Sequence, residues 1–191
     1  LDHRSKIKDL GFDAVFQGRF HPQKGVVELI DIWKKVVEEK PDARLAMIGD
    51  GPLMKDVRFK IKDLRLENNI KLFGYVFDGP KKYKIFSQSR IVVHPAFYDS
   101  GGMASAEAMT FGLPGVSFDL SALKTYYPSG MVKVPLNDID KFSQEILNLL
   151  NNKKLYLKIK QEALDLIRSH WSWDSLADKV LLKLEQDSLW S

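Results

Sequence analysis

The sequence predicts an α/β fold: a Rossmann-like open parallel sheet of about six strands, with helices on both faces and a helical C-terminal tail. Short apolar runs rich in β-branched residues alternate with longer segments of helical period, which is typical of a parallel sheet wrapped by helices. The chain has 191 residues, 45% of them hydrophobic, which is enough to bury a core. No internal repeat and no linker rich in Gly, Ser or Pro divides it, so we expect a single domain over residues 1–191.

The first elements form a strand–helix–strand unit. Residues 14–16 predict a strand, and apolar residues at helical spacing over 26–37 predict a helix that ends before Pro41. Residues 45–48 predict the second strand, which closes at the turn sequence Gly-Asp-Gly-Pro of residues 49–52.

The same order continues into the middle of the chain. An apolar stripe over 53–64 predicts a helix, and residues 70–75 predict a third strand. A short helix carrying Tyr83 and Phe86 then leads to a fourth strand at 91–93, which ends before Pro95.

The last part of the chain is mainly helical. Gly101 and Gly102 open a predicted helix that runs to Met109, and strands are predicted at 116–118 and 131–134. From residue 138 onward we expect helices, with apolar stripes at Phe142/Ile146/Leu149, Ile159/Ala163/Ile167 and Leu176/Val180/Leu184.

The net charge of +4 is concentrated in residues 53–84, which hold nine basic and four acidic residues, a balance of +5. Such a stretch can face nucleic acid or an anionic membrane. Acidic residues interrupt it, however, and its aromatic residues do not show the interleaving with cations that is typical of base stacking. We therefore expect a solvated helix face and no nucleic-acid partner, while a membrane surface stays open as a partner.

The composition excludes several kinds of chemistry. Without cysteine the chain has no disulfide, thiolate metal site or thiol nucleophile, and its four histidines lack metal-ligand spacing, so we expect no metal. No apolar run approaches the roughly 18 residues of a membrane span, and the N-terminus lacks the apolar core of a signal peptide. We expect a cytoplasmic protein, with peripheral attachment to a membrane left open.

Open α/β sheets bind ligands at the carboxyl ends of their strands, so the loops at 18–25, 49–52 and 94–103 are the candidates for a site. The first loop fits neither the GxGxxG dinucleotide fingerprint nor the GxxxxGK[ST] phosphate loop. It does place Arg19 after a strand and Lys24 at a helix start, a pair of cations that suits a diphosphate. Two exposed loop cations are the alternative interpretation.

The third loop combines two glycines with two carboxylates. Gly101 and Gly102 permit close approach of a ligand to a helix N-terminus, whose dipole favours an anion. Asp99 and Glu107, eight residues apart, place two acceptors where they can bind different hydroxyls of one ligand. The alternatives are a helix N-cap for Asp99 and a favourable first-turn acid for Glu107. Small residues surround Glu107, so its carboxylate needs a partner.

Four segments of the chain carry a family resemblance. They read GRFxxxKG, LAMIGDGP, IKLFGYV and DSGGMxxxEAMxxGLPGV, and they lie between residues 14 and 118. In order and spacing they resemble the C-terminal donor-binding domain of family four of the retaining glycosyltransferases, the GT-B group. The tail from Met131 to Leu184, with its WSWD segment, resembles that family's closing helices. Each segment alone is a weak signal, and four in register are specific.

The resemblance implies the catalytic positions. Arg19 and Lys24 match the basic pair that binds the donor diphosphate and stabilises the leaving nucleotide. Glu107 matches the second glutamate of the E-x7-E motif, which accepts hydrogen bonds from the ribose hydroxyls. Asp99 lies where the first glutamate contacts hydroxyls of the transferred sugar, so the implied catalytic residues are Arg19, Lys24 and Asp99.

The remaining site residues follow from the same resemblance. Gly101, Gly102 and Met103 would supply amides near the phosphates, Tyr75 and Val76 would edge the base, and Gly18 and Ser100 complete the nucleotide-sugar site. Asp99 is one methylene shorter than the usual glutamate, and Ser100-Gly101-Gly102 replaces the commoner xFG. This departure concerns the donor sugar and not the nucleotide.

The family enzyme has two Rossmann-like domains with the reaction centre between them, which requires roughly 300 residues. The resemblance therefore implies a donor-binding fragment that is inactive alone, with the acceptor bound by a missing N-terminal domain. The donor would be a UDP or GDP sugar, with no cofactor and no metal. The family's acceptor-domain histidine matches neither His21 nor His94, and we expect His94 to be a packed or edge residue.

Two other functions stay in view. A non-catalytic nucleotide-sugar-binding or regulatory module is favoured by the substituted first acidic position. An NAD-type oxidoreductase domain is disfavoured because the glycine fingerprint is absent.

Overall fold

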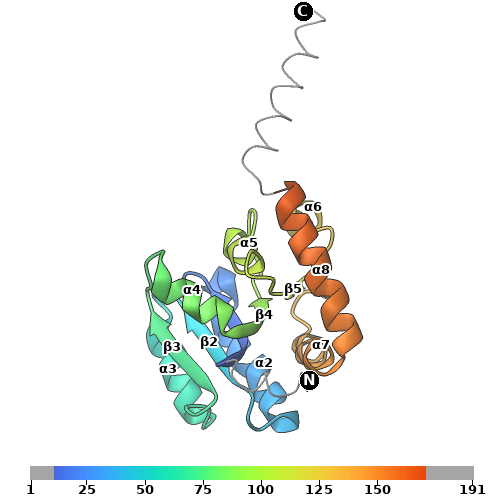
Figure 1. Ribbon diagram of the computed structural model, residues 1–191. Coiled ribbons are helices and arrows are strands. Elements are labelled where there is room, and N and C mark those ends of the chain that lie inside the picture. The colour runs from blue at the N-terminus through green and yellow to red at the C-terminus, as the bar shows by residue number, and fades with distance from the viewer. Residues whose placement is uncertain (1–10, 171–191) are drawn as a thin grey trace, which may run out of the picture.

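A computed structural model describes residues 11–170 of the protein and shows one parallel sheet between two layers of helices (Figure 1). Six strands lie in the order β3-β2-β1-β4-β5-β6, and every pair is parallel. Their bounds are β1 Phe12–Gln17, β2 Leu45–Ile48, β3 Ile70–Gly74, β4 Ser89–His94, β5 Gly115–Phe118 and β6 Met131–Val134. The predicted Rossmann-like sheet is confirmed.

The strand order reverses direction beside β1. From β1 the chain adds β2 and β3 on one side, and it then returns to place β4, β5 and β6 on the other. The loops that leave β1 and β4 therefore turn to opposite faces of the sheet. Such a switch point opens a crevice at the carboxyl ends of the strands, which is where ligands bind in open α/β sheets.

The helices form two layers. The elements are η1 Pro22–Lys24, α2 Val26–Glu39, α3 Met54–Asp63, α4 Pro80–Ser87, α5 Met103–Met109, α6 Ser121–Tyr126, α7 Ile139–Asn151 and α8 Lys153–His170. Helices α2, α3 and α7 pack on one face of the sheet, and α4, α5 and α8 contribute buried residues to the core on the other.

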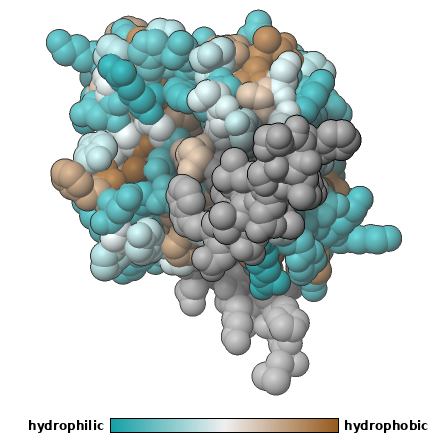
Figure 2. All heavy atoms as spheres, turned by 90° about the horizontal axis from the view of Figure 1, so that it is seen from above, coloured by the Kyte–Doolittle hydropathy of each residue, from teal (hydrophilic) through white to brown (hydrophobic). Residues whose placement is uncertain are grey.

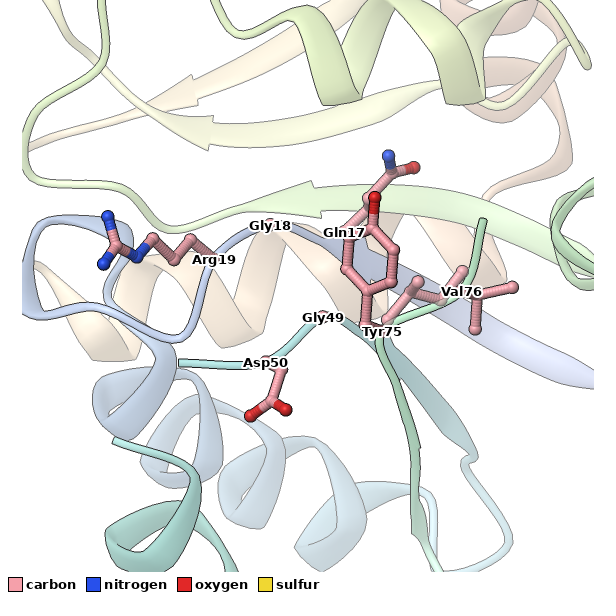
Figure 3. Close-up of a pocket in the computed structure, with 8 residues that line it drawn as sticks. Gln17, Gly18, Arg19, Gly49, Asp50, Tyr75 and Val76 are labelled. Atoms are coloured by element: carbon pink, nitrogen blue, oxygen red, sulfur yellow. The ribbon is translucent and has the colours of Figure 1, made fainter. Parts of the chain in front are cut away.

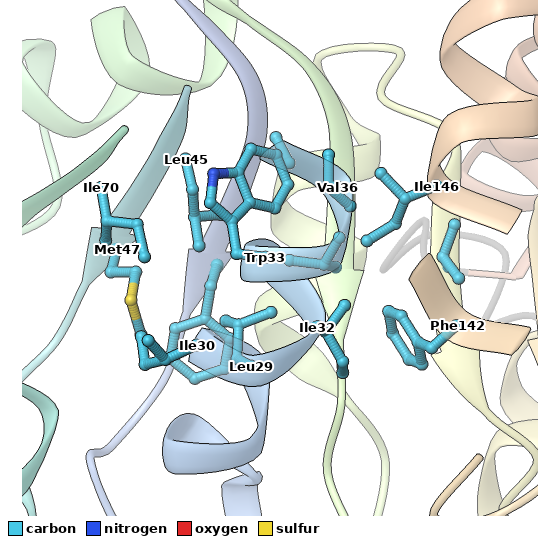
Figure 4. Packing of buried hydrophobic residues seen from close by; sticks show 14 of the residues in the cluster. Leu29, Ile30, Ile32, Trp33, Val36, Leu45, Met47, Ile70, Phe142 and Ile146 are labelled. Carbon is cyan, nitrogen blue, oxygen red and sulfur yellow. The ribbon is translucent and has the colours of Figure 1, made fainter. Parts of the chain in front are cut away.

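Both faces of the central strands are buried, which explains their continuous apolar runs, whereas the edge strand β3 exposes Lys71. In β1, Ala14 and Phe16 face the core that contains α2, while Val15 faces the core that contains α5. Figure 4 shows the first of these cores, where fully buried Trp33 of α2 lies close to Leu45. A strand covered on both faces needs no polar alternation, and each large side chain buried this way stabilises the fold by about 1.5–3 kcal/mol.

Several element limits differ from the predictions. Strands β1 and β4 include polar end residues such as Gln17 and His94, which the apolar runs did not mark. Helix α6 was missed because it is the shortest α-helix within residues 11–170 and buries only Leu123. The predicted stripe at Leu176/Val180/Leu184 and the WSWD segment lie outside the described residues.

The basic stretch is mostly solvated, as predicted. Lys55, Arg58 and Lys62 of α3 are exposed. Lys82 is the exception and corrects the prediction for this position: it is 2% exposed, because it lies on the side of α4 that faces α5.

The surface shows no sign of a membrane span within residues 11–170, where no helix is both long and apolar enough to cross a bilayer. On the face drawn in Figure 2, hydrophobic residues form separate spots among hydrophilic ones.

Candidate functional site

The loops that follow β1 and β4 meet at the switch point of the sheet. The backbone amides of Phe97 and Tyr98 donate to the carbonyl of Gln23, at 2.9 and 3.3 Å. These bonds bring the predicted diphosphate loop beside the loop that leads into α5. The sequence placed the two loops at one edge of the sheet, and the structure places them in contact.

Lys24, Asp99 and His94 form one charged cluster at this junction. The Nζ atom of Lys24 lies 2.5 Å from Oδ2 of Asp99, and Nε2 of His94 lies 3.1 Å from the same oxygen. His94 is 3% exposed, so the expectation of a packed residue holds. A buried carboxylate next to two nitrogen groups links the first loop to the end of β4.

The second oxygen of Asp99 caps the turn before α5. Its Oδ1 accepts hydrogen bonds from the backbone amides of Gly101 and Gly102, at 3.1 and 2.8 Å. Burial alone would raise the pKa of Asp99, but the contacts with His94, Lys24 and the two amides outweigh it and hold this pKa far below its ordinary value. Asp99 thus holds the turn that leads into α5, although the N-cap residue itself is Gly102 and has no side-chain cap bond. The contact of Asp99 with a sugar hydroxyl stays a prediction.

The hydroxyl of Tyr127 stabilises the same turn through two hydrogen bonds. Its hydroxyl donates to the carbonyl of Gly102 at 2.6 Å and accepts from the amide of Ala106 at 3.1 Å, and the residue is fully buried. Gly102 has φ +60, and a Cβ there would lie 3.0 Å from Leu123 and 3.1 Å from the Tyr127 ring. Only glycine fits this turn without strain.

A hollow of about 350 Å³ opens beside Arg19 (Figure 3). It is lined by Gln17, Gly18, Arg19, Ile48, Gly49, Asp50, Tyr75 and Val76. In Figure 3, Arg19 lies on one side of Gly18 and Gly49, and Tyr75 and Val76 lie on the other. The predicted diphosphate and base residues therefore border one space. Arg19 is exposed and forms no ion pair within residues 11–170.

The ring of Tyr75 remains accessible at the rim of this hollow. Tyr75 is 68% exposed and contacts the ring of Phe77 edge to face, with centroids 4.9 Å apart. Val76 is buried.

A second hollow of about 370 Å³ adjoins the first and shares Gln17 with it. Glu107, Met103 and Ala104 line it from α5. Met103 is 60% exposed there, and Ser100 lies exposed in the preceding loop. The two hollows share Gln17 and together make up the candidate site, which lies along the carboxyl ends of β1 and β2 and along α5.

Glu107 has the partner that its packed position demanded. One of its oxygens, Oε2, accepts a hydrogen bond from Nε2 of Gln17 at 2.9 Å. The other, Oε1, forms an ion pair with Lys82, which also contacts Asp78. Burial lowers the pKa of Lys82, but its bonds to Asp78 and Glu107 reverse the direction and raise it overall. The ion pair therefore holds a charged lysine against Glu107.

Three neighbouring strands, β4, β5 and β6, carry polar residues in register, beginning with His94, the partner of Asp99. His94 pairs in register with Ser117 of β5, and Ser117 pairs with Lys133 of β6. Lys133 Nζ lies 3.4 Å from Ser117 Oγ, and burial lowers the pKa of Lys133 to about 8. A nearby charge, Asp119, partly opposes that shift.

Sequence reasoning missed Gln17, Lys82 and Tyr127 as site residues. The available signals were a polar residue ending an apolar strand, a basic residue on the inner side of a short helix, and a tyrosine outside any periodic stripe. Apart from Asp78, which lies four positions from Lys82, their partners lie 21 to 90 positions away, so none of these signals identifies a partner in the site. Within residues 11–170 no group of three or more potential metal-ligating side chains occurs.

Comparisons with known proteins agree on one family. The family model described as "Glycosyl transferases group 1" matches residues 2–165. A poly(glycerol-phosphate) alpha-glucosyltransferase of Bacillus subtilis (strain 168) is 27% identical over 156 residues, which cover 80% of this chain and 23% of that protein.

Two solved structures extend the comparison. A mutant of TarM from S. aureus, in complex with Fondaparinux, alpha-GlcNAc-glycerol and UDP, superposes with a TM-score of 0.79 at 25% identity, covering 89% of this chain and 35% of that one. The C-terminal domain of a glycosyl transferase group 1 family protein, LpcC from Francisella tularensis, has the same fold, with a TM-score of 0.76 at 19% identity over 90% of this chain and 94% of that one. The chain thus spans a quarter to a third of the first two proteins and almost the whole of the isolated domain.

Proposed function

This chain belongs to the family of group 1 glycosyl transferases, and we propose that it is the donor-binding half of a retaining enzyme that transfers a sugar from a nucleoside diphosphate sugar. The observation that carries the proposal is the pair of adjoining hollows joined at Gln17. One borders Arg19 and the exposed ring of Tyr75, and the other borders Glu107. These apolar, cationic and acceptor surfaces suit the base, the diphosphate and the ribose of such a donor.

Different residues of the site suit the base, the ribose and the phosphates of the ligand. Tyr75 and Val76 offer apolar surface for the base, and Glu107 offers carboxylate lone pairs for the ribose hydroxyls. Arg19 is free to form a forked pair of hydrogen bonds with phosphate oxygens. Lys24 adds a compact positive charge, which Asp99 holds at the same loop.

The chemistry assigned to this half is stabilisation of the leaving group. The bond between the anomeric carbon and the β-phosphate oxygen breaks, and its electron pair stays on the diphosphate. The acceptor oxygen forms its bond to the anomeric carbon on the same face, and its proton passes to the departing diphosphate oxygen. Arg19 and Lys24 offset the charge that develops on the diphosphate, which favours the transition state over the ground state.

Two observations support the division of labour between two domains. The chain aligns along nearly all of a structure that is itself a C-terminal domain, and it spans 23% of a named glucosyltransferase. TarM, the structure with 25% identity, was solved with UDP, so UDP is the first donor nucleotide to test.

Titration calorimetry tests the proposal directly. The chain should bind at least one of UDP, GDP and ADP and should not bind NAD, because its β1 loop lacks the glycine fingerprint. Turnover assays on the chain alone should show no sugar transfer. Binding of none of the three diphosphates would refute the donor-binding assignment, and efficient transfer by this chain alone would refute the assignment of a half-enzyme.

A further inference from the structure

We propose that Lys82 is a positioning residue for donor binding: a buried cation that holds the carboxylate of Glu107 in the orientation that reads the ribose. The inference deepens the proposed function and rests on it. Nothing in the sequence pattern set Lys82 apart from the other cations of the 53–84 stretch.

Lys82 is buried, unlike its neighbours on α4. The side chain of Lys82 is 3% exposed, whereas Lys81 and Lys84 of the same helix are exposed. A buried ammonium costs several kcal/mol of desolvation unless a partner offsets it. Here the partners are Asp78, on the solvent side, and Glu107, on the side of the hollow.

The two carboxylate oxygens of Glu107 have different partners. Oε1 contacts Lys82 of α4, and Oε2 accepts from Gln17 of β1. Two elements remote in sequence therefore hold the carboxylate from two directions, which fixes its plane. A carboxylate has about four acceptor positions, so this arrangement leaves lone pairs for ligand hydroxyls on the side that lines the second hollow.

The Lys82 side chain also packs against the hydrophobic core. Its Nζ lies 5.9 Å from the centre of the Phe86 ring, and Phe86 is fully buried. The hydrophobic core thus restricts the position of the ammonium. An exposed lysine with four free rotors would not hold a carboxylate in one place.

The test compares Lys82→Met with its parent on two ligands. UDP and its 2′,3′-dideoxy analogue are titrated in parallel. The dissociation constant of the dideoxy analogue divided by that of UDP measures how strongly the site prefers the ribose hydroxyls. Lys82→Met should lower that ratio about tenfold, the range of one charge-assisted hydrogen bond. Affinity for the dideoxy analogue should change little, because its remaining contacts lie at Arg19, Lys24 and Tyr75.

Three further variants separate positioning from a structural role. Lys84→Met, an exposed lysine of the same helix, is the matched control and should leave both constants unchanged. Lys82→Arg keeps the cation and should recover most of the ribose preference. Glu107→Gln alone should also lower the ratio, and the double variant with Lys82→Met should lower it no further, because both act through one carboxylate.

The outcomes are distinct. If the parent binds no nucleoside diphosphate, the proposed function fails and this inference fails with it. If the parent discriminates ribose and Lys82→Met keeps the full ratio, only the positioning role is overturned. If Lys82→Met does not fold, Lys82→Gln replaces it, because Gln keeps most of the side-chain length without the charge. An undiminished ratio in folded Lys82→Gln, with Lys82→Arg as the charged comparison, overturns the positioning role.

Discussion

Replacement of Asp99 by Ala should destabilise the fold and weaken every donor ligand together. The Asp99 carboxylate holds two parts of the site at once. It caps the Gly101–Gly102 turn through two amide bonds, and it pairs with Lys24 of the diphosphate loop. Loss of the carboxylate therefore frees the N-terminus of α5 and the cation of the phosphate site in a single step.

The magnitude follows from these contacts. Loss of the carboxylate that accepts from the two turn amides costs about 1 kcal/mol of folding free energy, similar to the loss of an N-cap side chain. The Lys24 side chain is 27% exposed, so its pair with Asp99 is partly screened and contributes about 1 kcal/mol more. Buried His94 also loses its neighbour. The sum is about 2–3 kcal/mol, which lowers the melting temperature by roughly 5–10 °C for a chain of this size.

Thermal melting and calorimetry on one variant check this expectation. Affinities for UDP and for a UDP sugar should fall by the same factor, about three- to tenfold, because Lys24 is no longer held. If Asp99 also contacts the sugar, the nucleotide sugar should lose more than the nucleotide. An unchanged melting temperature and an unchanged affinity for UDP would refute the capping argument.

The pH dependence supplies an independent check on Asp99. Its folded-state pKa is lowered from 3.8, so the stability that it contributes is present above that value and is lost as the pH falls below it. The difference in unfolding free energy between parent and Asp99→Ala should therefore be constant at neutral pH and shrink below about pH 4.

Other substitutions test the remaining parts of the site. Arg19→Ala and Lys24→Ala should each weaken UDP binding by about 1.5–3 kcal/mol in calorimetry, but only Lys24→Ala should lower the melting temperature, because exposed Arg19 has no ion pair within residues 11–170. Lys133→Met should raise the free energy of unfolding at pH 7 by about 1–2 kcal/mol. The pKa of Lys133 is about 8 in the folded state and 10.5 in the unfolded state, so the parent gains stability as the pH rises between these values. The extra stability of Lys133→Met over the parent should therefore disappear in denaturant titrations across this pH range. Gly102→Ala should cost about 1–3 kcal/mol in thermal melts, since φ is +60 and Tyr127 leaves no room, whereas Gly11→Ala, where φ is not positive, should cost far less.

The sequence by itself determined the fold class and the positions of the strands. Apolar runs such as 45–48 are buried on both faces of the sheet, so they carry a signal that needs no knowledge of neighbours. The same holds for the loops at the carboxyl ends, because strand and helix patterns locate them. Arg19, Lys24, Asp99 and Glu107 were predicted in this way, and their roles stay predictions. The structure places Arg19 and Glu107 on the lining of the two hollows and pairs Lys24 with Asp99 before α5.

Only the tertiary structure decided what each charged group contacts. Lys82 and Gln17 meet at Glu107 although they come from different elements, and the pairing of His94 with Asp99 depends on the loop after β4 folding back over its own strand. Helix α6 and the hydrogen bond from Tyr127 to Gly102 were likewise identified only in the structure. The physical reason is that periodicity reports how a side chain faces the core, whereas an ion pair requires two side chains whose separation is set by the packing of whole helices and strands.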